Sequence, residues 1–185
     1  MAAFVVLLRG VNLGPHRRVS ASDLRGAALD AGFADVRTLL NSGNVVLTPG
    51  TSNADLPGDI ADLLSARLAE RIGTEVPALA LTADRLRAIG AANPFPAAAR
   101  DDPSRLQVHV PFGEVDETGI AQLDLRHPGR EHLGVAAGVV YVHYVDGIGR
   151  SKLTTAVLDK AAGTTMTARN WNTITRLREM LQDLS

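Results

Sequence analysis

This chain of 185 residues contains a strong hairpin signal in the segment Asp35-Val-Arg-Thr-Leu-Leu40-Asn41-Ser-Gly-Asn44-Val45-Val-Leu-Thr48. Two runs of apolar and β-branched residues, 35–40 and 45–48, have the composition of β-strands. The four residues between them are turn formers of the kind that a tight hairpin needs. The segment therefore predicts an antiparallel pair of strands in the first half of the chain.

The same order of elements is predicted around a hairpin in each half. Short apolar runs indicate strands, apolar residues at helical spacing indicate helices, and turn formers end each element. In the first half we expect a strand at 4–8, a helix at 21–31 capped by Ser20 and Asp23, strands at 35–40 and 45–48, a helix ending at Gly73, a strand at 76–81 and a helix at 82–92. In the second half we expect a strand at 106–110, a helix at 114–123, strands at 132–136 and 139–145 around Ala137-Gly138, a helix at 151–162, a strand at 164–168 and a helix at 171–184.

Both halves thus follow the order β-α-β-β-α-β-α, which contains the split β-α-β pattern of ferredoxin-like domains. We predict an α+β fold of two tandem ferredoxin-like units, each with one extra helix. The first unit is expected at 1–92 and the second at 105–185. Residues 93–104 are rich in turn formers and are predicted to be a linker.

This topology predicts where the polar loops meet. Right-handed crossovers make the first two strands of each unit parallel, and the hairpins reverse the chain direction. The 9–18 loop and the 42–44 hairpin tip are then expected at one sheet edge of the first unit. The 147–152 loop and the 169–172 turn are expected to share an edge in the second unit.

Composition indicates a folded protein without a strong overall charge. Hydrophobic residues make up 45% of the chain and the net charge is −1, so any basic site must be local. The chain has no cysteine, which excludes disulfides and thiolate metal sites. The apolar N-terminal run is too short for a signal peptide, and no run approaches the roughly 20 residues of a membrane helix. A cytoplasmic protein is expected, with no membrane partner.

The segment Asp146-Gly-Ile-Gly-Arg-Ser-Lys-Leu-Thr154 is predicted to open a helix. Ser151 is expected to be the N-cap, and Arg150 and Lys152 are expected beside free backbone N–H groups that attract anions. The spacing differs from that of the phosphate loop of nucleotide hydrolases. A simple helix cap with solvated cations is the alternative interpretation.

The segment Thr167-Ala-Arg-Asn-Trp-Asn-Thr173 contains the only tryptophan of the chain. Asn170 is expected to cap the following helix, and Arg169 and Asn172 flank Trp171. The indole either fills the core between helix and sheet or stacks on a base or sugar.

In the first half, the 9–18 loop contains three arginines, one histidine and no acid. Guanidinium groups match phosphate and carboxylate oxygens, so Arg9 and Asn12 are candidate ligand-binding residues. Turn geometry alone is the alternative explanation for Asn12. Ser42 and Asn44 are further candidates, although a hairpin needs such residues in any case.

The sequence indicates no metal site, no catalytic residue and no particular cofactor. None of the five histidines stands at metal-ligand spacing with another ligand, and no serine–histidine–acid set is evident from spacing. His109 and His143 fall in predicted strands and are expected to be packing or rim residues.

Five motifs stand in a fixed order along the chain: Arg9-Gly-Val-Asn12, Ser42-Gly-Asn-Val-Val46, Asn93-Pro-Phe95, Asp146-Gly-Ile-Gly-Arg-Ser-Lys-Leu153 and Thr167-Ala-Arg-Asn-Trp-Asn-Thr173. Together they resemble the bacterial domain-of-unknown-function 1697 family over nearly the whole chain. The family usually continues its first motif with glycines and a lysine, where this chain has Gly14-Pro-His-Arg-Arg18. The resemblance implies a cytoplasmic bacterial setting and no particular reaction.

Three functional hypotheses follow. The first is a binding protein for a nucleotide, a phosphorylated metabolite or a nucleic-acid backbone, in which Ser151 adds a contact at the helix start. The second is an enzyme acting on a phosphorylated or carboxylated small molecule, with Asp146 as general base. The third is a structural module that associates with itself through unpaired sheet edges. Both a monomer and a homodimer are compatible with the sequence.

Overall fold

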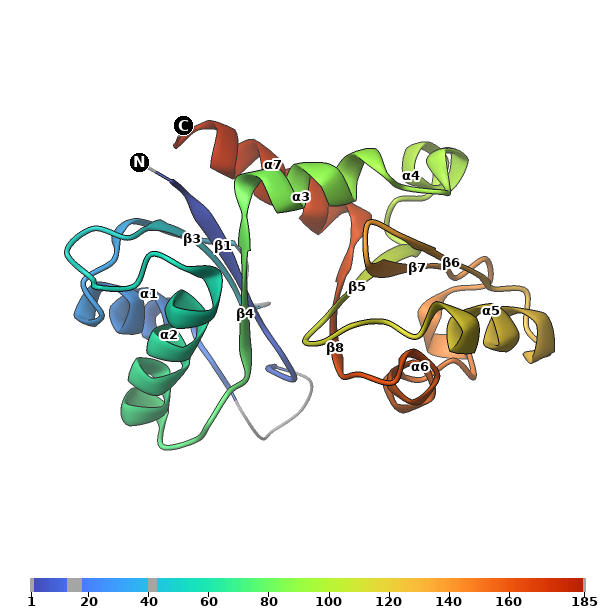
Figure 1. The fold of residues 1–185 in the computed structure, drawn as a ribbon, viewed down its shortest axis with the longest axis horizontal. Helices are drawn as coiled ribbons and strands as arrows, with labels where there is room; N and C mark the ends of the chain where they lie inside the picture. Colours follow the sequence, from blue (N-terminus) through green and yellow to red (C-terminus); the bar gives the residue numbers. More distant parts are fainter. Residues whose placement is uncertain (1, 13–17, 40–42, 185) are drawn as a thin grey trace. The chain divides into compact units, whose positions relative to one another are not determined.

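The computed structural model describes residues 2–12, 18–39 and 43–184 (Figure 1). The chain forms two compact units, Met1–Leu86 with Leu177–Ser185, and Arg87–Arg176. Within the described residues there are two antiparallel four-stranded sheets and seven α-helices, which is an α+β fold. Helices α3 (Ala83–Ala91) and α7 (Trp171–Gln182) each contribute residues to both units.

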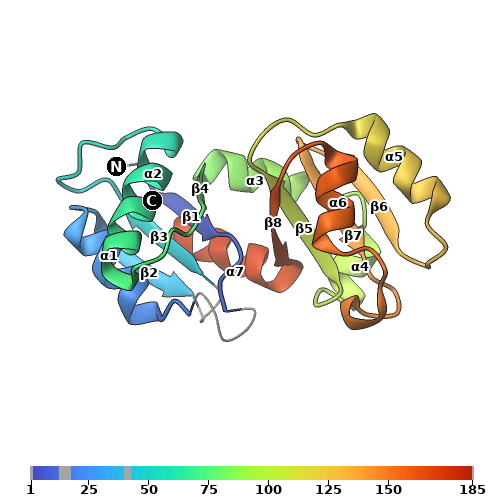
Figure 2. The same ribbon diagram turned by 90° about the horizontal axis from the view of Figure 1, so that it is seen from below.

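The first unit is a sheet with two helices, α1 and α2, side by side on one face (Figures 1 and 2). The strand order is β2-β3-β1-β4. The elements are β1 (Phe4–Leu8), α1 (Ala21–Asp30), β2 (Ala34–Leu39), β3 (Asn44–Thr48), α2 (Pro57–Ile72) and β4 (Ala78–Thr82). Every residue of β1 is buried, as its unbroken apolar run predicts for a strand covered on its faces.

Local sequence rules explain most boundaries in this unit. The predicted capping box is confirmed, because Ser20 Oγ accepts a hydrogen bond from the Asp23 N–H at 2.9 Å while the Asp23 carboxylate accepts from the Ser20 N–H at 3.3 Å. Helix α2 ends before Gly73, whose φ of 71° suits a glycine C-cap. Strand β4 begins two residues later than predicted, after Pro77, which has no N–H to donate to a strand ladder.

The second unit repeats this architecture. Its strand order is β6-β7-β5-β8, and α5 and α6 lie on one face of the sheet (Figures 1 and 2). The elements are α4 (Pro96–Asp101), β5 (Leu106–Pro111), α5 (Glu117–Arg126), β6 (His132–Ala136), β7 (Val139–His143), the 3-10 turn η1 (Ile148–Arg150), α6 (Thr155–Ala162) and β8 (Met166–Asn170). On the other face, the buried Tyr141 hydroxyl donates to the Ile89 carbonyl oxygen at 2.6 Å.

Both predicted hairpins are present. Ala137 and Gly138 have φ of 46° and 59°, the left-handed pair of a type I′ turn, and Ala136 faces Val139 across it. In the first unit β2 pairs with β3 in antiparallel register. The tip of that hairpin, residues 40–42, lies outside the described residues.

Several local predictions in the second half of the chain were wrong, among them the helix expected at 114–123, which is α5 (Glu117–Arg126) with Asp116 as its N-cap. The predicted helix at 151–162 begins only at Thr155, as the shorter helix α6, because residues 151–154 after the turn η1 are irregular. Thr154 rather than Ser151 is the N-cap, with its side chain accepting from the Val157 N–H at 3.4 Å. Helix α4 occupies part of the stretch predicted to be irregular, because its proline stands at the first helical position, where no N–H is needed. Strand β8 starts two residues late because the left-handed Gly163 first ends α6.

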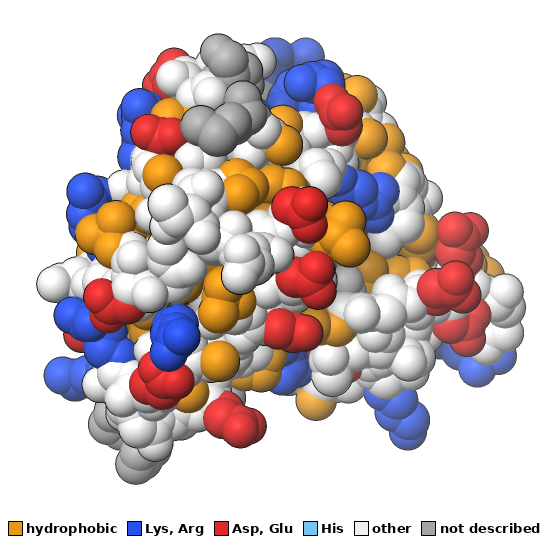
Figure 3. Space-filling view, turned by 60° about the vertical axis from the view of Figure 1, so that its left-hand side comes forward, with side chains coloured by type: hydrophobic (Ala, Val, Ile, Leu, Met, Phe, Trp, Pro, Cys, Tyr) orange, Lys and Arg blue, Asp and Glu red, His pale blue; other side chains and the backbone are white. Residues whose placement is uncertain are grey.

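None of the helices in the described part of the chain has the length and apolarity needed to span a bilayer. On the face shown in Figure 3, acidic and basic side chains are interspersed. This mixture agrees with the small net charge and means that a site for a charged ligand has to be sought in individual side chains.

Candidate functional site

One end of the second sheet collects polar segments from all four strands. His143 at the end of β7 faces both Leu106 at the start of β5 and His132 at the start of β6. On the other side of β5, Gln107 faces Asn170 at the end of β8. The loop after β7 and the turn after β8 therefore leave the sheet at the same end, which confirms the predicted juxtaposition.

The loop after β7, residues 146–153, carries two exposed cations and is named here the basic loop. Arg150 and Lys152 are exposed, and neither makes a hydrogen bond or ion pair with a described residue. Neighbouring cations differ in this respect. Arg130 pairs with Asp146 at 3.1 Å, and Arg105 pairs with Asp102 at 3.2 Å.

Internal hydrogen bonds give the basic loop a defined course. The Leu153 N–H donates to Ser151 Oγ at 3.0 Å, and the Ser151 N–H donates to the Ile148 carbonyl oxygen at 3.2 Å. The buried Tyr144 hydroxyl lies 3.5 Å from the Leu153 carbonyl oxygen. Burial, with a smaller contribution from the nearby Glu131 carboxylate, raises the pKa of Tyr144 to about 12, so this hydroxyl stays protonated at neutral pH.

A second polar cluster, around Glu131, lies near the loop. The pKa of Glu131 lies below its ordinary value, chiefly because of the nearby Ser151 side chain and against the opposing effect of burial. The Glu131 side chain is only 11% exposed, and its Oε2 lies 3.5 Å from His127 Nδ1. The other ring nitrogen of His127 faces Asp124 at 3.9 Å. The sequence predictions missed this cluster, because its members come from a helix end, a loop and the basic loop and show no periodic spacing.

The turn after β8 is held mainly by Asn170. Its Oδ1 accepts from both the N–H and the hydroxyl of Thr173 at 2.9 Å, which confirms the predicted helix cap. Trp171 is half-buried and Asn172 is exposed. Arg169 is 9% exposed and donates to Thr167 Oγ1 at 2.9 Å and to the Ala168 carbonyl oxygen at 2.7 Å. Burial lowers the pKa of Arg169 to about 10.

The first unit shows the other predicted juxtaposition. The Leu8 N–H donates to the Gly43 carbonyl oxygen, and the Arg9 N–H donates to the Pro77 carbonyl oxygen, each at 2.8 Å. The start of the 9–18 loop therefore lies beside the hairpin of β2 and β3. The Asn12 side chain closes this loop by donating to the Val19 carbonyl oxygen at 2.9 Å and accepting from the Val19 N–H at 3.0 Å. Its positive φ of 57° fits such a turn.

The other two candidate residues of the first unit are Asn44 and Ser42. Asn44 is fully buried and lies 3.4 Å from the Leu39 carbonyl oxygen. Because Asn44 is buried and contacts the preceding strand, it stabilises the hairpin. Ser42 lies outside the described residues.

The two histidines placed in strands are packing and rim residues, as predicted. His109 on β5 is 2% exposed, and burial lowers its pKa to about 4. His143 is half-buried at the sheet end, where its ring lies 6.3 Å from that of His132 and 6.5 Å from that of Phe95. Burial and the neighbouring His132 lower its pKa. In the described part of the chain no three His, Asp or Glu side chains are grouped as a metal site.

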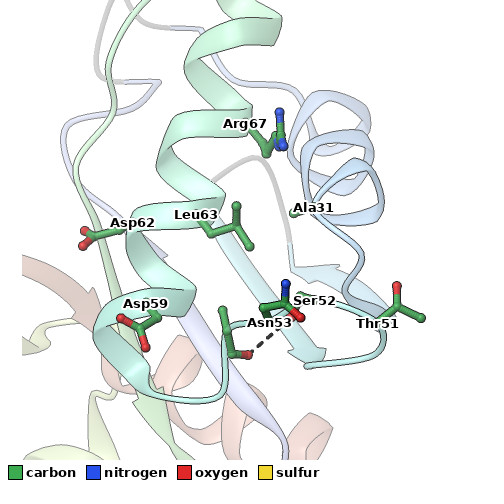
Figure 4. A pocket seen from close by; sticks show the side chains of 9 residues that line it. Ala31, Thr51, Ser52, Asn53, Asp59, Asp62, Leu63 and Arg67 are labelled. Atoms are coloured by element: carbon green, nitrogen blue, oxygen red, sulfur yellow. Dashed lines mark hydrogen bonds between the residues drawn. The ribbon is translucent and has the colours of Figure 1, made fainter.

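A groove of about 480 Å³ lies in the first unit between α1, α2 and the 51–54 loop. Figure 4 shows Leu63 and Arg67 of α2 pointing toward α1 and this loop, whereas Asp62 points to the opposite side of the helix. The Arg67 guanidinium pairs with Glu70 at 2.9 Å. With its cation paired and acids on its rim, the groove is a poorer anion site than the basic loop.

Comparison with known proteins places the chain in a family. The chain has the fold of the conserved bacterial protein SP0830 from Streptococcus pneumoniae, with 20% sequence identity and a TM-score of 0.72 over 97% of this chain and 98% of that one. No curated protein matches the chain. Residues 1–141 match the family described as protein of unknown function DUF1697, a range that ends before the basic loop. The chain therefore belongs to the DUF1697 family.

Proposed function

We propose that the basic loop binds a small anion, with Arg150 and Lys152 supplying the positive charge. The observation that carries this proposal is the difference between these two side chains and their neighbours. Arg130 and Arg105 have carboxylate partners, whereas Arg150 and Lys152 are exposed without a partner among the described residues. Unpaired guanidinium and ammonium groups two residues apart suit phosphate or carboxylate oxygens.

The N-terminus of helix α6 adds positive electrostatic potential beside the basic loop, which favours an anion. The helix begins at Thr155, just after the basic loop, and its first turn contains no acidic residue. The N-terminus of a helix carries partial positive charge and attracts anions. Exposed Asn172, from the turn at the same end of the sheet, offers a further hydrogen-bonding group.

The other candidate residues have supporting roles in this proposal. Arg169 and Asn170 support the turn after β8, and Trp171 is half-buried beside them. Ser151 holds the loop through its hydrogen bond with the Leu153 N–H. The residues Arg9, Asn12, Ser42 and Asn44 form the candidate set for an analogous site in the first unit.

Binding is favoured over general-base catalysis by the contacts of Asp146. Its carboxylate pairs with Arg130, and both side chains are exposed. An exposed carboxylate paired with a guanidinium is poorly suited to accept a proton from a substrate. We therefore propose a nucleotide or phosphorylated metabolite as ligand without assigning a reaction.

We also infer that the two halves are tandem ferredoxin-like units, at residues 1–92 and 105–185, joined by residues 93–104. The order β2-β3-β1-β4 and its counterpart β6-β7-β5-β8 support this inference. In each sheet the first strand lies between the third and the fourth, as the split β-α-β order requires. The fold shared with the pneumococcal protein extends over both halves.

The test is a binding titration with sodium phosphate, ATP and a single-stranded oligonucleotide, followed by calorimetry and thermal shift. We expect Arg150→Ala and Lys152→Ala each to weaken binding about tenfold, because each removes a charge-assisted contact. Lys160→Ala is the matched control, since Lys160 is exposed in the last turn of α6. Equal affinity of all three variants and the native protein would exclude the basic loop as the site.

Salt dependence separates the two kinds of ligand. If the oligonucleotide is bound through its phosphates, its affinity should fall steeply as salt rises, because counterions are released on binding. Affinity for ATP should fall less steeply. Tight ATP binding with no oligonucleotide binding would restrict the proposal to small molecules.

A further inference from the structure

The only carboxylate of the basic loop, Asp146, is held by an arginine from a different loop. The Arg130 guanidinium donates to Asp146 Oδ1 at 3.1 Å, and Arg130 lies in the connection between α5 and β6. We infer that Arg130 keeps the basic loop doubly positive by holding this carboxylate, and that the site therefore selects a doubly charged anion, a phosphate monoester. This inference rests on the proposed function.

Among the carboxylates of the chain, Asp146 is the nearest in sequence to both cations. It stands four residues before Arg150 and six before Lys152, within the same short loop. The backbone between them turns tightly, because the Arg150 N–H donates to the Gly147 carbonyl oxygen at 3.2 Å. Without another partner, the Asp146 carboxylate would be drawn to one of these cations, since opposite charges that can approach one another attract even in water.

The structure shows the carboxylate paired with Arg130 instead. Both side chains of this pair are exposed, to 72% for Arg130 and 51% for Asp146. Arg150 and Lys152 make no ion pair with a described residue. An exposed ion pair contributes little to folding stability, so the main effect of Arg130 is expected on the charge of the loop rather than on the fold.

The charge of the loop indicates the class of ligand. With Asp146 neutralised, Arg150 and Lys152 give the loop two net positive charges, and the start of α6 adds partial positive charge. A phosphate monoester carries about −1.5 to −2 charges at pH 7, whereas a phosphodiester carries only about one. Charge complementarity therefore favours the monoester, whether as the end of a nucleotide or of a phosphorylated metabolite.

Adenosine monophosphate and cyclic adenosine monophosphate are suitable probes, since they share base and sugar and differ in the charge of the phosphate. Calorimetry should show that the native protein binds the monoester about tenfold more tightly than the cyclic diester. Arg130→Ala should weaken binding of the monoester about fivefold and reduce this preference, because Asp146 is then available to neutralise one cation of the loop.

A double-mutant cycle separates this role from a direct contact between Arg130 and the ligand. Asp146→Asn alone should strengthen binding of the monoester. The double variant, Arg130→Ala with Asp146→Asn, should return to the native affinity, because the loop again carries two net positive charges. Arg130→Lys keeps the cation and should retain most of the preference for the monoester.

Arg67→Ala is the matched control. Arg67 forms an exposed ion pair with Glu70 at 2.9 Å on α2 in the first unit, so its removal changes the net charge of the protein by the same amount and leaves the basic loop intact. We expect no change in affinity for either nucleotide. An equal loss of affinity in Arg67→Ala and Arg130→Ala would overturn the inference, because net charge alone would then explain the effect.

The remaining outcomes distinguish the inference from the proposed function. Equal native affinity for the two nucleotides overturns the inference and leaves the proposed function standing. The same holds for unchanged affinity in Arg130→Ala, and for a double variant that binds as weakly as Arg130→Ala. Absence of binding of phosphate, ATP and adenosine monophosphate by the native protein overturns the proposed function together with the inference.

Discussion

Lowering the pH from about 6.5 to about 4 should reduce the free energy of unfolding by about 3 kcal/mol through His109 alone. This histidine is buried on β5, and burial lowers its pKa from 6.5 to about 4. In the native protein the ring therefore stays mostly neutral until the pH approaches 4, whereas in the unfolded chain it takes up a proton below about pH 6.5. The stabilisation is complete above the unfolded pKa and is lost as the pH falls toward the native one.

Chemical denaturation at several pH values checks this expectation, with His109→Leu as the comparison. Neither ring nitrogen of His109 has a hydrogen-bond partner among the described residues, so leucine should be tolerated at pH 7. Between pH 7 and pH 8 the native protein and the variant should show parallel stability curves. Below pH 6.5 the native protein should lose stability faster. An identical pH dependence in both would show that another group governs the acid response.

Replacing Gly119 by alanine should lower the free energy of unfolding by about 1–3 kcal/mol. Gly119 lies in α5, and a Cβ there would come within 2.1 Å of the Ala161 carbonyl oxygen on α6. Backbone cannot move aside as the end of a flexible side chain can, so the two helices would have to separate. The change should also loosen α6, which follows directly on the basic loop.

Gly58→Ala is the matched control for this prediction. Gly58 lies in the first turn of α2, is exposed, and has no atom within 4 Å of an added Cβ. Alanine there should raise stability by up to about 1 kcal/mol, because it lowers the conformational entropy of the unfolded chain. Denaturant midpoints of the two variants should therefore move in opposite directions. A stabilising Gly119→Ala would contradict the close approach of α5 and α6.

Features set by a few adjacent residues could be predicted from the sequence. Ser20 with Asp23, the pair Ala137 and Gly138, and Asn170 each carry out the local role expected of them. Their partners lie within three residues, so the chemistry of a short segment is sufficient. The order of strands and helices follows equally from apolar periodicity, and the right-handed crossover then determines which loops meet.

The candidate site could be predicted only in part. The basic loop and its two cations are evident in the sequence, yet Ser151 was expected to cap a helix, and its Oγ instead accepts the Leu153 N–H within the loop. Arg169 and Lys152 look alike as basic residues in polar motifs, but one is buried and the other exposed. Whether a basic side chain is covered depends on residues that are distant in the chain, which the motif itself does not contain.

The sequence by itself thus determined the strands, the hairpins, most helix caps and the sheet end at which the polar loops gather, since these depend on local propensity and on chain connectivity. Only the tertiary structure decided which polar groups are partnered. The burial of Glu131 beside His127, and the absence of a partner for Arg150 and Lys152 among the described residues, arise when the segments around β6, β7 and α6 come together. Hydrogen-bond partners in a folded protein are chosen by proximity in space, which spacing along the chain does not encode.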